Sequence, residues 1–197
     1  QLALTAFAFA TRKGARRGWS AAGWAGLALA ALAKSALLSA GLVFGSLLFF
    51  LFLEGGVGMV RRGFGRMCTL PGLVVFLVLA APWYVAAALG HGPELLEAHF
   101  LGHFRRLMSS PVDAKPPYFY LVTLVWAFLP WSIFLPTGIL HGKDRIARDG
   151  ERFALVWTLF MLVALSFVSA KKPGYALVVW PPLSLLIAAA LFETREW

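Results

Sequence analysis

The sequence predicts an all-α protein, a polytopic bundle of transmembrane helices. Hydrophobic residues make up 60% of the 197 residues, charged residues make up 14%, and the mean hydropathy is +0.76. Soluble domains contain about 45–50% apolar and about 25% charged residues, and a core of this size could not bury so much apolar surface. The same hydrophobicity excludes a disordered chain. The single cysteine, Cys68, excludes a disulfide scaffold.

The first apolar run covers only residues 1–10. It is too short to cross about 30 Å of hydrocarbon at about 1.5 Å per residue. It also lacks a basic segment and a small-residue cleavage site, so it is not a signal peptide. We interpret this run as the end of a helix whose beginning is missing, and we expect the chain to be part of a longer protein.

The second apolar run, residues 19–53, is 35 residues long and is interrupted only by Lys34. As one straight helix it would be about 52 Å long, well beyond the hydrocarbon thickness of a membrane. We therefore predict two spans, over residues 19–33 and 36–53, that form a hairpin at Lys34–Ser35.

The rest of the chain contains four more runs of spanning or near-spanning length. They cover residues 70–89, 118–140, 153–169 and 176–192. Together with the hairpin they give about six spans in a single transmembrane domain over residues 1–197, with a long outer loop at residues 90–117.

Loop charge supports the hairpin and predicts the orientation. The hairpin puts 12 of the 18 Lys and Arg residues on one side, in residues 11–18, 54–67, 141–152 and 193–197. One long span would instead put the first two basic loops on opposite sides, against the positive-inside rule. The basic side is therefore predicted to be cytoplasmic. The same rule accounts for the net charge of +9, so no nucleic-acid partner is expected.

The other side carries six cations that this rule does not require. They are Lys34, Arg105, Arg106, Lys115, Lys171 and Lys172, against only Glu94, Glu97 and Asp113. Two interpretations are open. The cations extend to lipid headgroups, or they gather at the outer membrane boundary around an anionic ligand.

Residues 93–108 predict an amphipathic helix that lies in the plane of the interface. Pro93 suits the first helical position, and the apolar side chains fill one arc of about 140°. On the other side His99, His103 and Arg106 fall within about 60° of one another. Imidazole and guanidinium groups suit a phosphate, although the same side chains would also suit water or headgroups. A metal site at the two histidines would lack a clear third ligand.

Four motifs occur in order along the chain. They are Ala33-Lys34-Ser35-Ala36 at the helix break, Pro82-Trp83-Tyr84, the segment His99–Leu107 followed by Tyr118-Phe119-Tyr120, and the segment Ser169–Tyr175 followed by Pro181-Pro182. The aromatic residues alone are typical of an interfacial belt. In this order and on this side, the motifs resemble those of the GT-C membrane glycosyltransferases that use polyprenyl-phosphate sugars. The most similar branch contains the lipid A aminoarabinose transferases and the protein O-mannosyltransferases.

The resemblance implies transfer of a sugar from a polyprenyl-phosphate carrier to lipid A, another glycolipid or a protein. The reaction would take place on the outer face of a bacterial inner membrane, among membrane lipids. Fixed cations would stabilise the charge that grows on the leaving phosphate. The candidate substrate-binding residues are Lys34, Arg106 and Lys172, supported by His103 and Tyr175, with Lys171 as the alternative to Lys172.

The same resemblance assigns no catalytic residue in these 197 residues. The family's acidic residue lies in an outer loop near its N-terminus, so it is expected upstream of Gln1. The 197 residues alone are therefore expected to be inactive. The resemblance requires no cofactor. Whether the site also binds a divalent cation is left open.

Two other functions fit a membrane protein of this kind. A transporter or flippase for polyprenyl lipids would carry ionisable residues near the middle of its spans, whereas the predicted spans contain none apart from Lys34 at the break. A non-catalytic membrane subunit is the second alternative, and donor binding by the complete protein would separate it from an enzyme.

Overall fold

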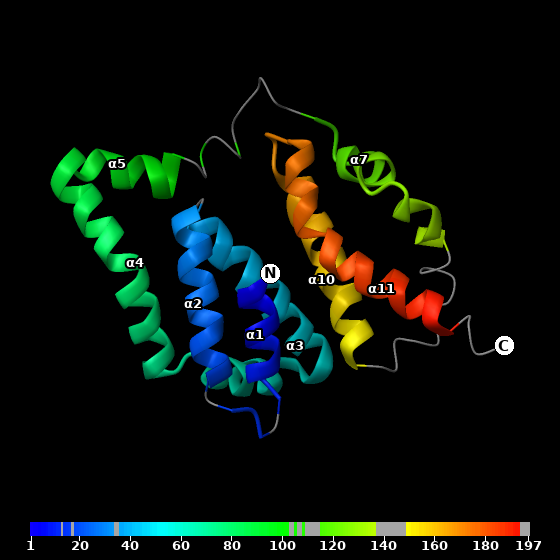
Figure 1. Cartoon of the computed structure of the whole chain (residues 1–197), viewed down its shortest axis with the longest axis horizontal. Coiled ribbons are helices and arrows are strands. Elements are labelled where there is room, and N and C mark those ends of the chain that lie inside the picture. The colour runs from blue at the N-terminus through cyan, green and yellow to red at the C-terminus, as the bar shows by residue number, and fades with distance from the viewer. Residues whose placement is uncertain are drawn as a thin grey trace. The chain divides into compact units, whose positions relative to one another are not determined.

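The computed structural model describes residues 1–12, 14–16, 18–33, 36–102, 105, 108, 115–136 and 149–193. Within these residues every regular element is a helix, which confirms the predicted all-α class (Figure 1). The chain divides into two compact units, unit 1 over Gln1–Arg106 and unit 2 over Leu107–Trp197. Among the described helices, three are long and apolar enough to cross a membrane: Ala36–Met67, Leu70–His91 and Gly150–Phe167.

The described residues of unit 1 form six helical elements. They are α1 (Leu2–Ala10), α2 (Gly18–Ala33), α3 (Ala36–Met67), α4 (Leu70–His91), α5 (Pro93–Glu97) and the π-helix η1 (Ala98–Gly102). Helices α2 and α3 are separate and pack together, in agreement with the two helices predicted on either side of Lys34–Ser35. The Ser39 hydroxyl donates a hydrogen bond to the Ala30 carbonyl, at 3.4 Å, and so links the two helices close to the break.

Helix α3 is longer than the predicted span over residues 36–53, because a basic helical segment follows a kink. The kink lies at Gly55 and Gly56, and Gly56 has φ 60°. This left-handed conformation favours glycine, which has no Cβ to clash. Beyond the kink, a Cβ on Gly63 would lie 2.4 Å from Leu51 Cδ1. The second part of α3 therefore packs closely against the first.

An aromatic cluster and small residues hold unit 1 together. The Trp24 ring centroid lies 5.7 Å from that of Phe7 and 5.6 Å from that of Phe76. Where α1 meets α2, a Cβ on Gly26 would lie 2.8 Å from the Ala3 backbone nitrogen. Membrane helices use such small residues to approach one another closely.

The turn between α3 and α4 is tied to α2 by side-chain hydrogen bonds. The Met67 carbonyl accepts from Ser20 Oγ at 2.7 Å and from Trp24 Nε1 at 2.9 Å. Thr69 caps α4 by accepting from the Gly72 backbone N–H at 3.3 Å. These bonds satisfy backbone groups that a helix end would otherwise leave without partners.

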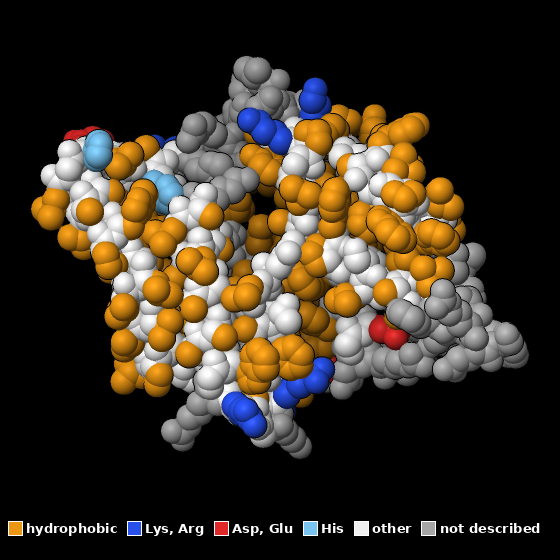
Figure 2. All heavy atoms as spheres, in the orientation of Figure 1, with side chains coloured by type: hydrophobic (Ala, Val, Ile, Leu, Met, Phe, Trp, Pro, Cys, Tyr) orange, Lys and Arg blue, Asp and Glu red, His pale blue; other side chains and the backbone are white. Residues whose placement is uncertain are grey.

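The long apolar helix α4 leaves much of its side-chain surface uncovered within the described structure. Leu70 is 75% exposed, Val78 66% and Leu89 85%. Figure 2 shows hydrophobic side chains along this helix. Exposed apolar surface of this extent is typical of a helix that faces lipid.

Unit 2 contains α7 (Phe119–Ala127), the 3₁₀-helix η2 (Trp131–Phe134), α10 (Asp149–Phe167), the 3₁₀-helix η3 (Pro173–Val178) and α11 (Trp180–Glu193). Helix α10 packs against α11, and α7 packs against η3. In this unit the predicted helix over residues 118–140 differs from the structure, since α7 ends at Ala127 and a turn leads into η2. Pro130 lies in that turn, and proline has no N–H and clashes with the preceding helical turn. Residues 137–140 lie outside the described part of the chain.

The predicted interfacial helix of the outer loop begins at Pro93, as the sequence indicated, and every described residue from there to Met108 is helical, although the middle is a π-helix. α5 gives way to a π-helix at Ala98, and of residues 103–108 the structure describes only Arg105 and Met108. Leu101 and Met108, both on the predicted apolar arc, are 43% and 45% exposed.

Candidate functional site

The segment Ser169–Tyr175 joins α10 to η3 and contains the two lysines predicted on the outer side. We call it the outer turn. Ser169 Oγ donates to the Met108 carbonyl at 2.9 Å. Lys171 is only 5% exposed, and its ammonium donates to the Val168 carbonyl just after the end of α10. A cation near a helix C-terminus is favourable, because the last carbonyls carry partial negative charge.

The neighbouring lysine has a different environment. Lys172 is exposed and has an extended backbone, with φ −119° and ψ 140°, so that it serves as the N-cap of η3. Its carbonyl accepts from the Tyr175 N–H at 3.0 Å, and Pro173 fixes the first position of η3. Tyr175 is half-buried. The structure thus separates the two lysines, which the sequence left as alternatives, into one buried and one accessible cation.

Tyr120 is a residue that the sequence left out of the candidate site. It is 1% exposed, and its buried hydroxyl lies beside the backbone of Lys172. Lys172 and Tyr175 are its polar neighbours. The sequence signal was the motif Tyr118-Phe119-Tyr120, which resembled the glycosyltransferases but was also typical of an interfacial belt.

Two further motifs meet at one end of unit 1. The Tyr84 hydroxyl donates to the Ala31 carbonyl at 3.4 Å and lies 3.5 Å from His99 Nε2. The Trp83 ring lies 5.4 Å from His99, and the Phe100 ring stacks on Tyr84 at 5.2 Å. His99 therefore packs among aromatic rings, whereas the sequence placed it in a polar stripe. This cluster links the Pro-Trp-Tyr motif to the outer-loop helix.

Three predicted substrate-binding residues, Lys34, His103 and Arg106, lie outside the described residues. Arg105 forms an ion pair with Glu97 at 3.5 Å, and both side chains are mostly exposed. Such a pair contributes little stability. No group of three His, Cys, Asp or Glu side chains gathers at a metal-binding distance in the part of the chain that the structure describes.

Comparison with known proteins gives consistent matches in sequence and in structure, although no protein-family model matches the chain. It is 34% identical over 120 residues to the undecaprenyl phosphate-alpha-4-amino-4-deoxy-L-arabinose arabinosyl transferase of Serratia proteamaculans. It is 35% identical over 120 residues to the transferase of the same name from Yersinia enterocolitica. Each match covers 59% of this chain, but only 21% and 22% of the respective relatives. The chain thus matches about a fifth of their length.

Two solved structures of ArnT from Cupriavidus metallidurans share the fold. The structure bound to undecaprenyl phosphate has a TM-score of 0.80 at 27% identity, and the apo structure has a TM-score of 0.77 at 25% identity. Both comparisons cover 96% of this chain and 34% of the solved chain. With these matches and its long apolar helices, the chain is part of a multi-pass membrane protein. The resemblance inferred from the motifs is confirmed: the chain is related, in sequence and in fold, to the undecaprenyl-phosphate-dependent aminoarabinose arabinosyl transferases.

Proposed function

We propose that the complete protein transfers a sugar from a polyprenyl-phosphate carrier to an acceptor on the outer face of a bacterial inner membrane. The observation that carries this proposal is the similarity of fold to a transferase solved with undecaprenyl phosphate, at a TM-score of 0.80 over 96% of this chain. The names of the relatives favour 4-amino-4-deoxy-L-arabinose as the sugar. The acceptor is lipid A, another glycolipid or a protein.

In this reaction the carrier phosphate is the leaving group, so the protein must stabilise the negative charge that grows on it. Fixed cations in a partly water-excluded site supply this stabilisation. Lys172 is the candidate for direct contact, because its side chain is exposed while the Lys171 ammonium is bonded to a carbonyl at the end of α10. We assign Lys171 to holding the outer turn in place.

Two tyrosines complete the proposal for the outer turn. Tyr175 lies three residues after Lys172, and its backbone N–H donates to the Lys172 carbonyl. The two residues therefore lie on the same first turn of η3. We propose that the Tyr175 hydroxyl donates to the carrier phosphate. Tyr120 is buried beside both residues and is proposed as a positioning residue. Lys34, His103 and Arg106 stay candidates for the same substrate on the sequence alone.

The topology that accompanies this function is one transmembrane domain with about six spans, the outer turn outside and the α3–α4 turn in the cytoplasm. The native Cys68, exposed in the α3–α4 turn, reports on it directly. Partial desolvation by neighbouring atoms raises the pKa of the Cys68 thiol above its usual range, although the residue is exposed, so labelling should be slow at neutral pH and is best done near pH 8.

In intact cells, a membrane-impermeant maleimide should leave Cys68 unlabelled until the membrane is permeabilised. As the matched control, Gly174→Cys in a Cys68→Ser background should be labelled without permeabilisation, because Gly174 is exposed and a Cβ there meets open space. Labelling of both positions from one side would contradict the proposed topology.

The function itself is tested with the complete protein in bacterial membranes. Undecaprenyl-phosphate-linked aminoarabinose and lipid A are supplied, and the mass of lipid A is measured before and after incubation. We expect modified lipid A together with free undecaprenyl phosphate. Donor binding without transfer to lipid A, another glycolipid or protein would instead identify a non-catalytic subunit. Movement of the donor between leaflets without transfer would identify a flippase.

A further inference from the structure

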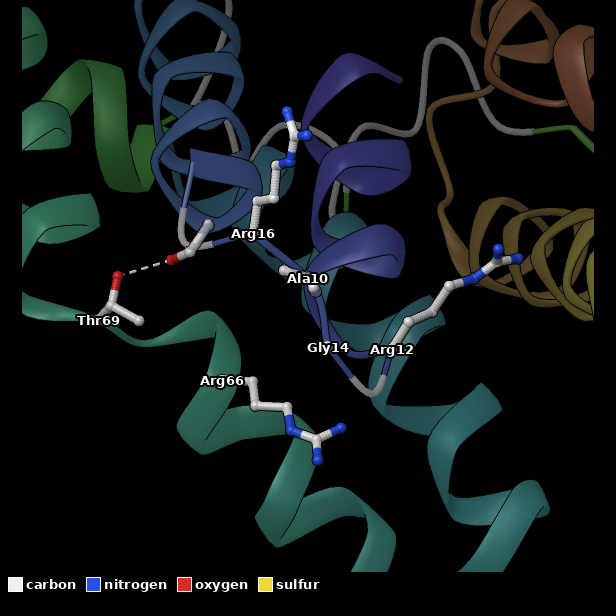
Figure 3. A pocket seen from close by; sticks show the side chains of 8 residues that line it. Ala10, Arg12, Gly14, Arg16, Arg66 and Thr69 are labelled. Carbon is white, nitrogen blue, oxygen red and sulfur yellow. Dashed lines mark hydrogen bonds between the residues drawn. The ribbon is translucent and has the colours of Figure 1, made fainter.

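A pocket of 220 Å³ lies in unit 1 between the α1–α2 turn and the end of α3. We call it the arginine pocket. Arg12 and Arg16 line it from the turn, Arg66 lines it from α3, and Ser20 and Thr69 line it from α2 and the α3–α4 turn (Figure 3). Its volume suits a phosphate-sized group and is below the range of about 300–1,000 Å³ found for drug-sized ligands.

The positive charge of the arginine pocket is not neutralised within the described residues. None of its three arginines forms an ion pair with a described carboxylate. Arg66 donates to the Thr11 carbonyl at 2.6 Å, and the Arg12 guanidinium lies 5.0 Å above the Phe9 ring. All three side chains are exposed. An anion here would therefore meet guanidinium groups with donors to spare, since each carries five N–H groups.

Apolar surface adjoins this charge. The rings of Phe9 and Trp19 stack at 4.9 Å beside the α1–α2 turn, and they are 37% and 41% exposed. On the second part of α3, Phe64 is 48% exposed. Figure 2 shows hydrophobic side chains next to Lys and Arg side chains at the end of the unit where α1 and α2 meet. A ligand that fits both features has an anionic head and an apolar body.

We propose that the arginine pocket binds the phosphate headgroup of an anionic phospholipid, with the acyl chains along Phe9 and Trp19. Arginine recognises phosphate through paired N–H donors. Loop charge predicts this end to be cytoplasmic, where anionic lipids attract basic segments next to the membrane. In Figure 3 the three guanidinium groups point in different directions around the turn, so their side chains would have to rotate toward a headgroup that all three contact. This proposal does not depend on sugar transfer.

The test uses native mass spectrometry of the complete protein, extracted in a mild detergent and titrated with phosphatidylglycerol. Phosphatidylcholine with the same acyl chains tests the need for net negative charge, and inorganic phosphate tests a water-soluble source. We expect retention of phosphatidylglycerol over phosphatidylcholine. Arg16→Gln and Arg66→Gln should each weaken phosphatidylglycerol binding by about fivefold, and more when combined.

Arg62→Gln is the matched control, because Arg62 is exposed on the same helix and, within the described residues, its guanidinium donates to the Gly58 carbonyl of its own turn and does not line the pocket. It should leave binding within about twofold. Trp19→Ala should weaken phosphatidylglycerol binding, which distinguishes a lipid from a free anion. The Arg16 carbonyl accepts from the Trp19 N–H at 3.1 Å, but the Arg16 side chain forms no hydrogen bond or ion pair with the described residues, so Arg16→Gln stays interpretable even if Arg66→Gln unfolds the turn. Equal losses in Arg62→Gln, equal binding of phosphatidylcholine, or displacement of the lipid by millimolar inorganic phosphate would overturn the proposal.

Discussion

The α1–α2 turn and the outer turn are both short and basic, but the fold treats their cations differently. In the α1–α2 turn, Arg12 and Arg16 are exposed. In the outer turn Lys171 is 5% exposed, and its neighbour Lys172 is exposed. A charge that serves only membrane topology needs no burial, since it acts through its side of the membrane. Burial of Lys171 therefore distinguishes the outer turn, which is built around a cation, from the α1–α2 turn, whose arginines stay exposed to a ligand.

The largest difference between the two turns is expected in sugar transfer. Lys172→Ala in the complete protein should remove a charge-assisted contact to the carrier phosphate of about 1.5–3 kcal/mol. Turnover or donor affinity should then fall roughly tenfold to more than a hundredfold. The measurement is sugar transfer at matched membrane expression. Arg12→Ala, the control from the other turn, should leave transfer within about twofold, and equal effects of the two changes would remove the distinction between the turns.

The next effect concerns what fixes the ends of the helices beside the α1–α2 turn. There the structure relies on close packing, because a Cβ on Gly72 would lie 2.2 Å from Trp24 Cδ1. Gly72→Val should therefore lower the free energy of unfolding by about 1–3 kcal/mol through overpacking. Thermal unfolding in detergent measures this, with Gly41→Val as the control, since a Cβ at Gly41 meets no atom within 4 Å. An unchanged melting temperature for Gly72→Val would show that α2 and α4 do not pack this closely.

A smaller effect, on the free energy of unfolding, is expected when the buried Lys171 of the outer turn is replaced. Lys171→Met keeps an apolar stem but loses the bond to the Val168 carbonyl and the favourable position near the end of α10. The free energy of unfolding should fall by about 1 kcal/mol. Transfer should fall less than in Lys172→Ala. If Lys171→Met instead abolished transfer with an unchanged melting temperature, Lys171 would be the phosphate ligand and the two roles would be exchanged.

The sequence predicted the helix boundaries well where composition changes sharply. The break at Lys34–Ser35 follows from helix length and loop charge, and the structure has α2 ending at Ala33 and α3 beginning at Ala36. The end of the apolar part of α3 was predicted at Leu53, just before the kink at Gly55 and Gly56. The basic helical segment beyond the kink was missed, because hydropathy indicates where a span ends and not whether the helix continues along the interface.

Other features of the fold and the site depend on tertiary contacts, which the spacing of hydrophobic residues along the sequence does not predict. Pro130 was visible within the predicted span over residues 118–140, but prolines are tolerated in membrane helices, so the break after Ala127 did not follow from it. The sequence named Lys171 and Lys172 as alternatives, and only packing distinguishes them. Burial of Tyr120 beside the outer turn likewise arises from contact between α7 and η3, which are far apart in the sequence.

Binding of the carrier phosphate by the outer turn is tested most directly by comparing undecaprenyl phosphate with undecaprenol, which lacks the phosphate. The affinities of both for the complete protein are measured in detergent, for the wild type, Lys172→Ala and Arg62→Ala, since Arg62 is exposed and does not line the arginine pocket. The wild type and Arg62→Ala should prefer the phosphate, and Lys172→Ala should lose about tenfold or more of that preference. An unchanged preference in Lys172→Ala would contradict a phosphate contact at this lysine.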